Sequence, residues 1–318
     1  MRRRRTIRSA VLAAVVLAAC IRPSAQTPAG SSVPPMDTGR IAIGGGSLFY
    51  EAAGSGAPVI LIHGGNLDRR MWDPQFELLR TQYRVVRYDA RGFGRSSAVD
   101  QPFSAHDDLA ALMRGLHIKR ASIVGLSLGG RIAIDFALKY PEMVDRLVLA
   151  APGISGGTWA PSSDTAWRAS AMEAVKRNDS VGVALAWLGS DYIRSALHPP
   201  ERAAWLRQIS VENSGFWGGM IRHGDLERAA EPPAAGRLKA IQAPVLLLVG
   251  GNDTPYIHEV AAAITARVPH VKRVDIPYVG HMLNLEATER FNRELLAFLA
   301  NPPPRQRTVP PERLSGVR

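Results

Sequence analysis

The feature that most constrains the fold is a glycine-flanked serine turn, GLSLG, at residues 125–129. It follows an apolar run, Ala121–Leu126, typical of a buried strand, and opens a helix-like stretch, Leu128–Tyr140. A serine on a sharp strand-to-helix turn is lifted off the sheet, and the free N–H groups of the new helix point at its hydroxyl. The pattern predicts Ser127 as a nucleophile. The alternative is a glycine-rich turn that holds an incidental serine.

Strand-like and helix-like stretches alternate on both sides of this turn, through residues 39–152 and 239–300. We expect an antiparallel hairpin from Arg40–Ile43 and Ser47–Glu51, followed by buried strands at Pro58–Ile62, Tyr83–Tyr88, Ala121–Leu126, Val144–Ala150, Pro244–Val249 and Lys272–Ile276. Helices are expected over 104–116, Leu128–Tyr140, Tyr256–Val268 and Ala287–Ala300, the first with a capping box of Ser104 and Asp107. This alternation predicts an α/β fold with a mainly parallel eight-stranded sheet covered on both faces.

Residues 153–238 interrupt the alternation with a mostly helical pattern and contain five of the six tryptophans. Such a stretch is too long for a loop, so it predicts a helical cap over the carboxyl edge of the sheet, where ligands bind in such folds. Trp159, Trp187 and Trp217 are candidates to line an apolar substrate pocket. The alternative is that these tryptophans only pack the interior of the cap.

A serine nucleophile needs a base and an acid at the same edge of the sheet. His281 follows the predicted strand Lys272–Ile276, and Asp253 follows the predicted strand Pro244–Val249. Because parallel strands end at a common edge, both side chains are expected beside Ser127. The chain order of serine, acid and base is also one that is known for serine triads. The alternatives are a surface-loop histidine and an ordinary turn aspartate.

The developing negative charge on a substrate oxygen requires N–H donors. The sequence HGGN at residues 63–66 follows the predicted strand Pro58–Ile62. We expect the backbone N–H groups of Gly65 and Leu128 to form this oxyanion hole, with the Asn66 side chain as a further candidate.

These motifs resemble the α/β-hydrolase superfamily over nearly all of residues 39–300, and most resemble the branch of 3-oxoadipate enol-lactonases and related small-molecule esterases. The strings that carry the resemblance are MWDPQ at 71–75, RYDARGFGRSS at 87–97, GLSLGG at 125–130 and GHMLNLE at 280–286. The resemblance implies a cofactor-free serine hydrolase that cleaves small esters or lactones through an acyl-enzyme. Segment Asp89–Ser97 is expected to brace loops beside the site.

Two other functions fit the same sequence. A cofactor-free perhydrolase or haloperoxidase would share the triad, and a non-catalytic protein would use the capped pocket to bind an apolar ligand. Metal catalysis has no support, because the sequence contains neither a His-Glu-x-x-His motif nor a cysteine cluster.

The first nineteen residues read as a signal peptide, with five arginines before the apolar run Ala10–Ala19. That run is too short to cross a bilayer, which takes roughly 20 residues. It ends in LAAC at 17–20, which resembles a lipoprotein box and predicts lipidation of Cys20, export and anchoring to a membrane. The alternative is cleavage after Ala25, which would release a soluble exported protein.

Residues 20–38 are rich in proline, serine and alanine and predict a flexible tether, and 301–318 predict a disordered tail. The net charge of +11 is concentrated at the two ends, since five arginines lie within 1–19 and four within 301–318. A nucleic-acid-binding protein would carry its positive charge on the folded domain, so nucleic acid is not an expected partner.

Overall fold

The computed structural model describes residues 36–159 and 166–300. The predicted signal peptide, Cys20, nearly all of the predicted tether and the predicted tail lie outside these residues. No helix within the described ranges is long and apolar enough to cross a membrane.

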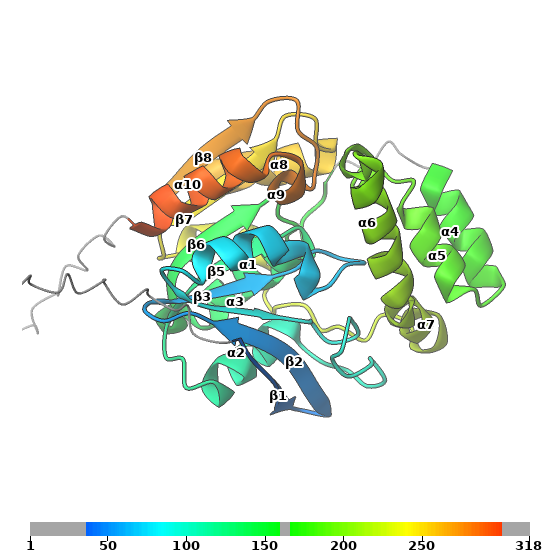
Figure 1. The fold of residues 1–318 in the computed structure, drawn as a ribbon, viewed down its shortest axis with the longest axis horizontal. Coiled ribbons are helices and arrows are strands. Elements are labelled where there is room, and N and C mark those ends of the chain that lie inside the picture. Colours follow the sequence, from blue (N-terminus) through cyan, green and yellow to red (C-terminus); the bar gives the residue numbers. More distant parts are fainter. Residues whose placement is uncertain (1–35, 160–165, 301–318) are drawn as a thin grey trace, which may run out of the picture. The chain divides into compact units, whose positions relative to one another are not determined.

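Eight strands form one sheet in the order β1-β2-β4-β3-β5-β6-β7-β8 (Figure 1). Their bounds are β1 Asp37–Ile43, β2 Gly46–Ala53, β3 Pro58–Ile62, β4 Arg84–Tyr88, β5 Ala121–Leu126, β6 Val144–Ala150, β7 Val245–Gly250 and β8 Val271–Ile276. Strand β2 pairs antiparallel with both β1 and β4, and all other pairs are parallel. The predicted mainly parallel sheet is therefore confirmed.

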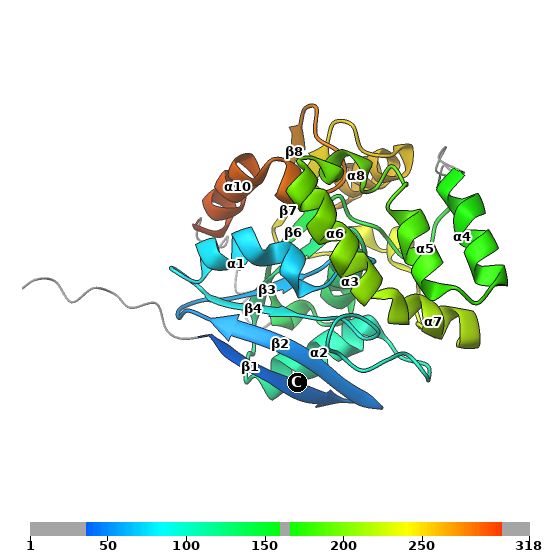
Figure 2. The same ribbon diagram turned by 45° about the vertical axis from the view of Figure 1, so that its right-hand side comes forward.

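Helices cover both faces of this sheet, with α1 and α10 packed together on one of them (Figures 1 and 2). The helices outside the stretch between β6 and β7 are α1 Asp73–Leu79, α2 Ala105–Gly115, α3 Leu128–Lys139, α8 Pro255–Arg267, α9 Leu283–Glu286 and α10 Thr288–Ala300. Helix α1 was not predicted, because its seven residues show too few turns for a helical period to stand out. Single turns of 3-10 helix lie at Arg69–Trp72, Pro141–Met143, Arg194–Leu197, Ala234–Gly236 and Leu238–Ala240.

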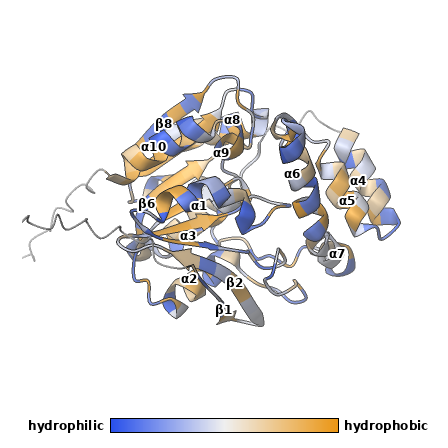
Figure 3. Ribbon diagram, viewed as in Figure 1, coloured by the Kyte–Doolittle hydropathy of each residue, from blue (hydrophilic) through white to orange (hydrophobic). Residues whose placement is uncertain are grey.

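Strands β3 and β7 have unbroken apolar sequences, as is expected of strands that are buried on both faces of a sheet. Every residue of β5 and β7 is buried. In strand β8 at the edge, Ile276 is buried and the other residues are half-buried or exposed. Figure 3 shows the same contrast, with hydrophobic residues along the inner strands and hydrophilic ones on β8.

The predicted capping box at the start of α2 is wrong. Ser104 is the N-cap residue, but its side chain makes no capping hydrogen bond. Asp107 instead accepts hydrogen bonds from the Lys139 ammonium at 2.6 Å and the Tyr140 hydroxyl at 2.7 Å. The Asp107 carboxylate therefore bonds to residues at the end of α3, and it does not cap the start of α2 as the local sequence pattern had predicted.

Between β6 and β7 the described residues form four α-helices, which we call the helical insertion: α4 Ala166–Lys176, α5 Ser180–Trp187, α6 Pro200–Glu212 and α7 Ser214–His223. Figures 1 and 2 show these helices together, beyond the carboxyl ends of the parallel strands. Apolar side chains of the insertion, Trp187, Leu206 and Ile209 among them, join the same hydrophobic core as the sheet. The limits of a separate cap, 153–238, stay a prediction.

Candidate active site

Ser127 sits on a strained turn between β5 and α3, with φ 54° and ψ −111°. A positive φ is uncommon for a residue other than glycine. The flanking glycines serve a different purpose, since they make room. A Cβ on Gly125 would lie 2.2 Å from the Gly129 carbonyl oxygen, and one on Gly129 would lie 2.2 Å from the Ile62 oxygen. The two glycines therefore let α3 begin in close contact with the ends of the strands. The residue that adopts the unusual positive φ is Ser127 itself.

Neighbouring backbone holds the turn in place. The Ser127 N–H donates to the Ala150 carbonyl at 3.0 Å, and the Gly153 N–H donates to the Ser127 carbonyl at 3.0 Å. Both partners lie at or just after the end of β6, the strand next to β5 in the sheet. The sheet thus fixes the backbone from which the Ser127 hydroxyl projects.

Asp253 and His281 form a buried pair after β7 and β8. The His281 Nδ1 lies 2.9 Å from Oδ2 and 3.0 Å from Oδ1 of Asp253. The Asp253 Oδ1 also accepts the Thr254 N–H at 2.7 Å. A carboxylate can only accept, so Nδ1 carries the proton and Nε2 is left as the acceptor. The imidazole is therefore oriented as a base would need to be.

Glu286 braces the turn that carries His281, a contact that the sequence analysis missed. Its carboxylate accepts the Gly280 N–H at 2.8 Å and the Met282 N–H at 3.0 Å. The two donors flank His281 in the chain, so one side chain fixes the backbone on both sides of the histidine. An acid five residues after a histidine in a turn is a weak sequence signal.

The HGGN segment lies beside Ser127, because Gly64, Gly65, Asn66 and Leu128 line one cavity with Ser127 and His281. His63 anchors this segment through its ring. Its Nδ1–H donates to the Gly64 carbonyl at 2.8 Å, and its Nε2 accepts the Ala90 N–H at 2.9 Å. Burial lowers the pKa of His63, which keeps the ring in the neutral form that this pattern requires.

Segment Asp89–Ser97 braces the same region, as the family resemblance led us to expect. The Asp89 carboxylate accepts the Arg69 N–H at 3.0 Å and the Arg95 N–H at 2.8 Å. It also pairs with the Arg69 guanidinium at 3.0 Å. Asp89 therefore joins the end of the HGGN loop to its own loop.

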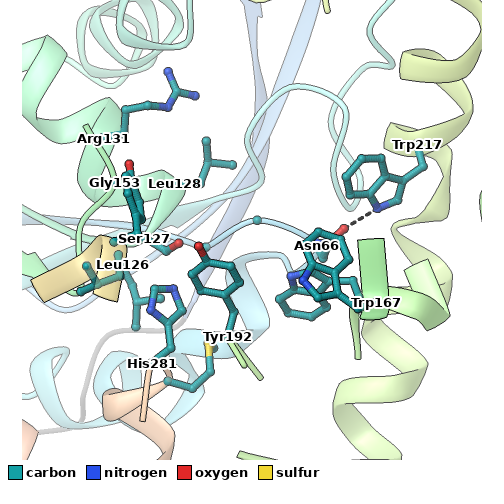
Figure 4. Close-up of a pocket in the computed structure, with 16 residues that line it drawn as sticks. Asn66, Leu126, Ser127, Leu128, Arg131, Gly153, Trp167, Tyr192, Trp217 and His281 are labelled. Carbon is teal, nitrogen blue, oxygen red and sulfur yellow. Dashed lines mark hydrogen bonds between the residues drawn. The ribbon is translucent and has the colours of Figure 1, made fainter. Parts of the chain in front are cut away.

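The cavity above Ser127 has a volume of about 310 Å³ and is lined mostly by apolar and aromatic residues (Figure 4). Figure 4 shows the Ser127 hydroxyl and the His281 imidazole on the same side of it. Its larger apolar and aromatic lining residues are Leu126, Leu128, Trp167, Trp187, Tyr192, Trp217, Tyr256, Ile257 and Met282. The Tyr192 ring meets the His281 ring edge-on, with centroids 4.9 Å apart. The helical insertion therefore builds much of the wall that faces the serine.

Of the three predicted pocket tryptophans, Trp187 and Trp217 line this cavity. Trp159 is not among the lining residues. Its Nε1–H donates to the Gly156 carbonyl at 2.7 Å, and its ring packs edge-on against Tyr256, which does line the cavity. Trp167 lines the cavity, although the sequence analysis did not select it.

The Asn66 side chain faces the insertion, because its Oδ1 accepts a hydrogen bond from the Trp217 Nε1–H (Figure 4). Any donation from this side chain to a substrate would therefore come from its Nδ2. The backbone of Asn66 has φ 60°. Asparagine tolerates this left-handed conformation better than most residues.

The profile of the Alpha/beta hydrolase family matches residues 59–294. The carboxylesterase YbfK of Bacillus subtilis is 28% identical over 254 residues, which cover 76% of this chain and 79% of that protein. A putative carbamate hydrolase, RutD of Yersinia enterocolitica, is 28% identical, with coverage of 79% and 92%.

Solved structures agree with these matches. A thermophilic esterase of Thermogutta terrifontis superposes with a TM-score of 0.67 at 30% identity, covering 83% of this chain and 98% of that one. The enol-lactonase of Burkholderia xenovorans superposes with a TM-score of 0.68 over 83% and 100%, and at 24% identity it shows the fold alone. The predicted resemblance is confirmed, and the chain belongs to the alpha/beta hydrolase family.

Proposed function

We propose that the chain is a serine hydrolase that cleaves carboxylic esters or lactones of small apolar substrates. The observation that carries the proposal is a serine on a strained turn that shares a cavity with a carboxylate-paired histidine. The likeness to a carboxylesterase and to a thermophilic esterase supports the same chemistry.

The arrangement performs acyl transfer in two steps. His281 Nε2 takes the Ser127 proton as Oγ attacks the carbonyl carbon, and the N–H groups of Gly65 and Leu128 hold the oxyanion. The tetrahedral intermediate collapses to an acyl-serine as His281 returns the proton to the leaving alcohol oxygen. Water then gives a proton to His281 and attacks the acyl group, and His281 passes that proton to Ser127 Oγ as the acid is released.

A fluorophosphonate probe and a series of p-nitrophenyl esters of increasing chain length, run beside lactones, test this proposal. We expect the wild-type protein to react covalently with the probe and to hydrolyse the short and aromatic esters. A protein that only binds apolar ligands would leave the probe unreacted. A perhydrolase would form peracid from acetate and hydrogen peroxide faster than it hydrolyses the esters.

The charge inside the cavity favours neutral substrates. Among the lining residues in the described ranges, Arg131 is the one with a permanent charge, and it lies one turn after Ser127 on α3. Its guanidinium pairs with Glu227 at 2.7 Å and faces the buried Asp135 at 3.8 Å. Because two carboxylates surround the cation, an anionic group on a substrate gains little attraction there.

We therefore expect Glu227→Gln to shift substrate preference toward anionic esters. Removing one carboxylate leaves Arg131 with excess positive charge, so the kcat/KM for the p-nitrophenyl half-ester of a dicarboxylic acid should rise on the order of 10-fold relative to a neutral ester. The measurement is the ratio of the two kcat/KM values. Glu231→Gln is the matched control, since it removes an exposed carboxylate of the same segment. If the ratio of kcat/KM for the anionic ester to that for the neutral ester were equal in Glu227→Gln and Glu231→Gln, Glu227 would not be the residue that neutralises Arg131.

We also propose that the protein is exported and carries a lipid on Cys20. The arginine-rich start, the short apolar run and the LAAC sequence support this proposal. Cys20→Ala is expected to abolish fatty-acid incorporation and leave the activity of the purified hydrolase unchanged. The mass of the mature N-terminus measures the outcome, because a start at Gln26 without a lipid would mean ordinary signal cleavage.

A further inference from the structure

The loop that carries Gly65 meets the corner between helices α6 and α7, where Asn213 lies. Asn213 is 3% exposed, and its carboxamide makes three hydrogen bonds. Nδ2 donates to the Asp68 carboxylate at 3.0 Å and to the Ile209 carbonyl at 2.8 Å. Oδ1 accepts the Gly94 N–H at 2.6 Å. One buried amide therefore joins the helical insertion to two loops of the catalytic core.

Asp68 is the core partner in this joint, and it sits three residues after Gly65. Its carboxylate caps the short helix Arg69–Trp72 by accepting the Arg70 N–H at 3.0 Å. Burial disfavours the charge, but hydrogen bonds from Arg70 and Asn213 outweigh it and hold the pKa of Asp68 below its ordinary value. The carboxylate thus stays ionised, and the loss of Asn213 would remove one of the donors that stabilise it.

Two aromatic residues that follow Asn213 on α7 make a second attachment. The Trp217 Nε1–H donates to Asn66 Oδ1, next to Gly65. Phe216 stacks on Phe93 with centroids 4.4 Å apart, and Phe93 meets the His63 ring edge-on at 5.2 Å. We call residues 63–68, which include Gly65, the oxyanion loop. Helix α7 therefore contacts this loop directly at Asn66, and it contacts His63 through the ring of Phe93.

These contacts hold the loop on both sides of the proposed donor. His63 lies before Gly65, and Asn66 and Asp68 lie after it. Gly65 itself has open space on its side-chain side, since a Cβ built there would meet nothing within 4 Å. The position of its N–H group is therefore set by its attached neighbours. Oxyanion donors act only when they are held near the developing charge, so this support bears directly on the rate.

We infer that Asn213 and Trp217 are positioning residues that hold the oxyanion loop from the helical insertion. This inference rests on the proposed function. On this inference the α6–α7 corner contributes to the chemical step by positioning the loop, and Trp217 also forms part of the cavity wall. The role predicts a loss in kcat, because the loop matters most where the carbonyl oxygen becomes negative.

The test compares Asn213→Ala and Trp217→Phe with Glu212→Gln on a p-nitrophenyl ester. Trp217→Phe keeps an aromatic ring but removes the N–H donor to Asn66 and makes the side chain smaller where it lines the cavity. Both variants are expected to lower kcat on the order of 10-fold with KM changed less than about twofold. Glu212→Gln is the matched control. Glu212 is the residue before Asn213 and is exposed, and the substitution removes its ion pair with Arg70. Its kcat should stay within about twofold of wild type.

Inhibition by phenylboronic acid separates positioning from general damage, because this inhibitor forms a tetrahedral adduct on an active serine. Its inhibition constant should rise in both variants in parallel with the fall in kcat/KM. Thermal unfolding shows whether Asn213→Ala folds, and Trp217→Phe keeps the test decisive if it does not. An active wild type with unchanged kcat in Trp217→Phe, or a rise in KM alone, overturns the inference. A wild type inert toward ester and probe overturns the proposed function and the inference with it.

Discussion

Ser127→Ala is expected to fold normally and to lose ester hydrolysis by a factor on the order of 10⁴ or more in kcat. The hydroxyl is the atom that forms the acyl-enzyme, and no other group in the cavity replaces it in the proposed mechanism. Alanine at φ 54° bears the same backbone strain as serine, so the turn itself is unchanged. The measurement is kcat on a p-nitrophenyl ester, beside the thermal unfolding midpoint.

The matched control for this variant is Ser97→Ala, since Ser97 lies in the bracing segment away from the cavity and accepts the Ser47 N–H at 2.9 Å. It should retain most of the activity. Retention of even a tenth of the wild-type kcat by Ser127→Ala would show that another group is the nucleophile. Loss of fluorophosphonate labelling in the same variant identifies the site of reaction independently.

The second large effect is expected at the histidine and its acid. His281→Ala removes the base and should be nearly as damaging as the loss of Ser127. Asp253→Asn should cost somewhat less, on the order of 10³- to 10⁴-fold in kcat. The Thr254 N–H already donates to Asp253 Oδ1, so the amide oxygen of an asparagine would take that place and turn its NH₂ toward His281. Nδ1 would then have to accept, and the proton would move to Nε2, which faces the serine.

The same ester assay measures both variants, and a pH series shows whether higher pH restores any rate. Asp275→Asn is the matched control for the acid, because Asp275 lies on β8 and pairs with Arg273 at the surface. It should behave as wild type. If Asp253→Asn and Asp275→Asn were equally active, the buried carboxylate would have no part in orienting the imidazole.

The sheet and the nearest neighbours of Ser127 could be predicted from the sequence, because those features are encoded locally. Strands β3 and β7 are apolar throughout, and the turns after β7 and β8 carry Asp253 and His281. Parallel strands end at one edge, so the approach of these residues follows from the fold class.

The support of the site was not predictable in this way, because it consists of contacts between segments far apart in the sequence. Asn213 and Asp68 are separated by 145 residues, and neither stands in a recognisable motif. Of the three predicted pocket tryptophans, Trp187 and Trp217 do line the cavity, and Trp159 was chosen wrongly for a related reason. Trp159 and Trp167 have the same chemistry, and only the packing of the insertion decides that the second lines the cavity. The Asp107 contact with α3 likewise overrode a plausible local cap.

The strained turn at Ser127 has a consequence for how such a protein can evolve. A backbone in a sparsely populated region costs on the order of 1–3 kcal/mol, and here the residue that bears it is the proposed nucleophile rather than a glycine. Substitution by glycine would relieve that cost and abolish the chemistry in one step. Mutations that favour thermal stability and mutations that preserve turnover are therefore in conflict at this position, and a drift toward a more stable chain leads away from an active one.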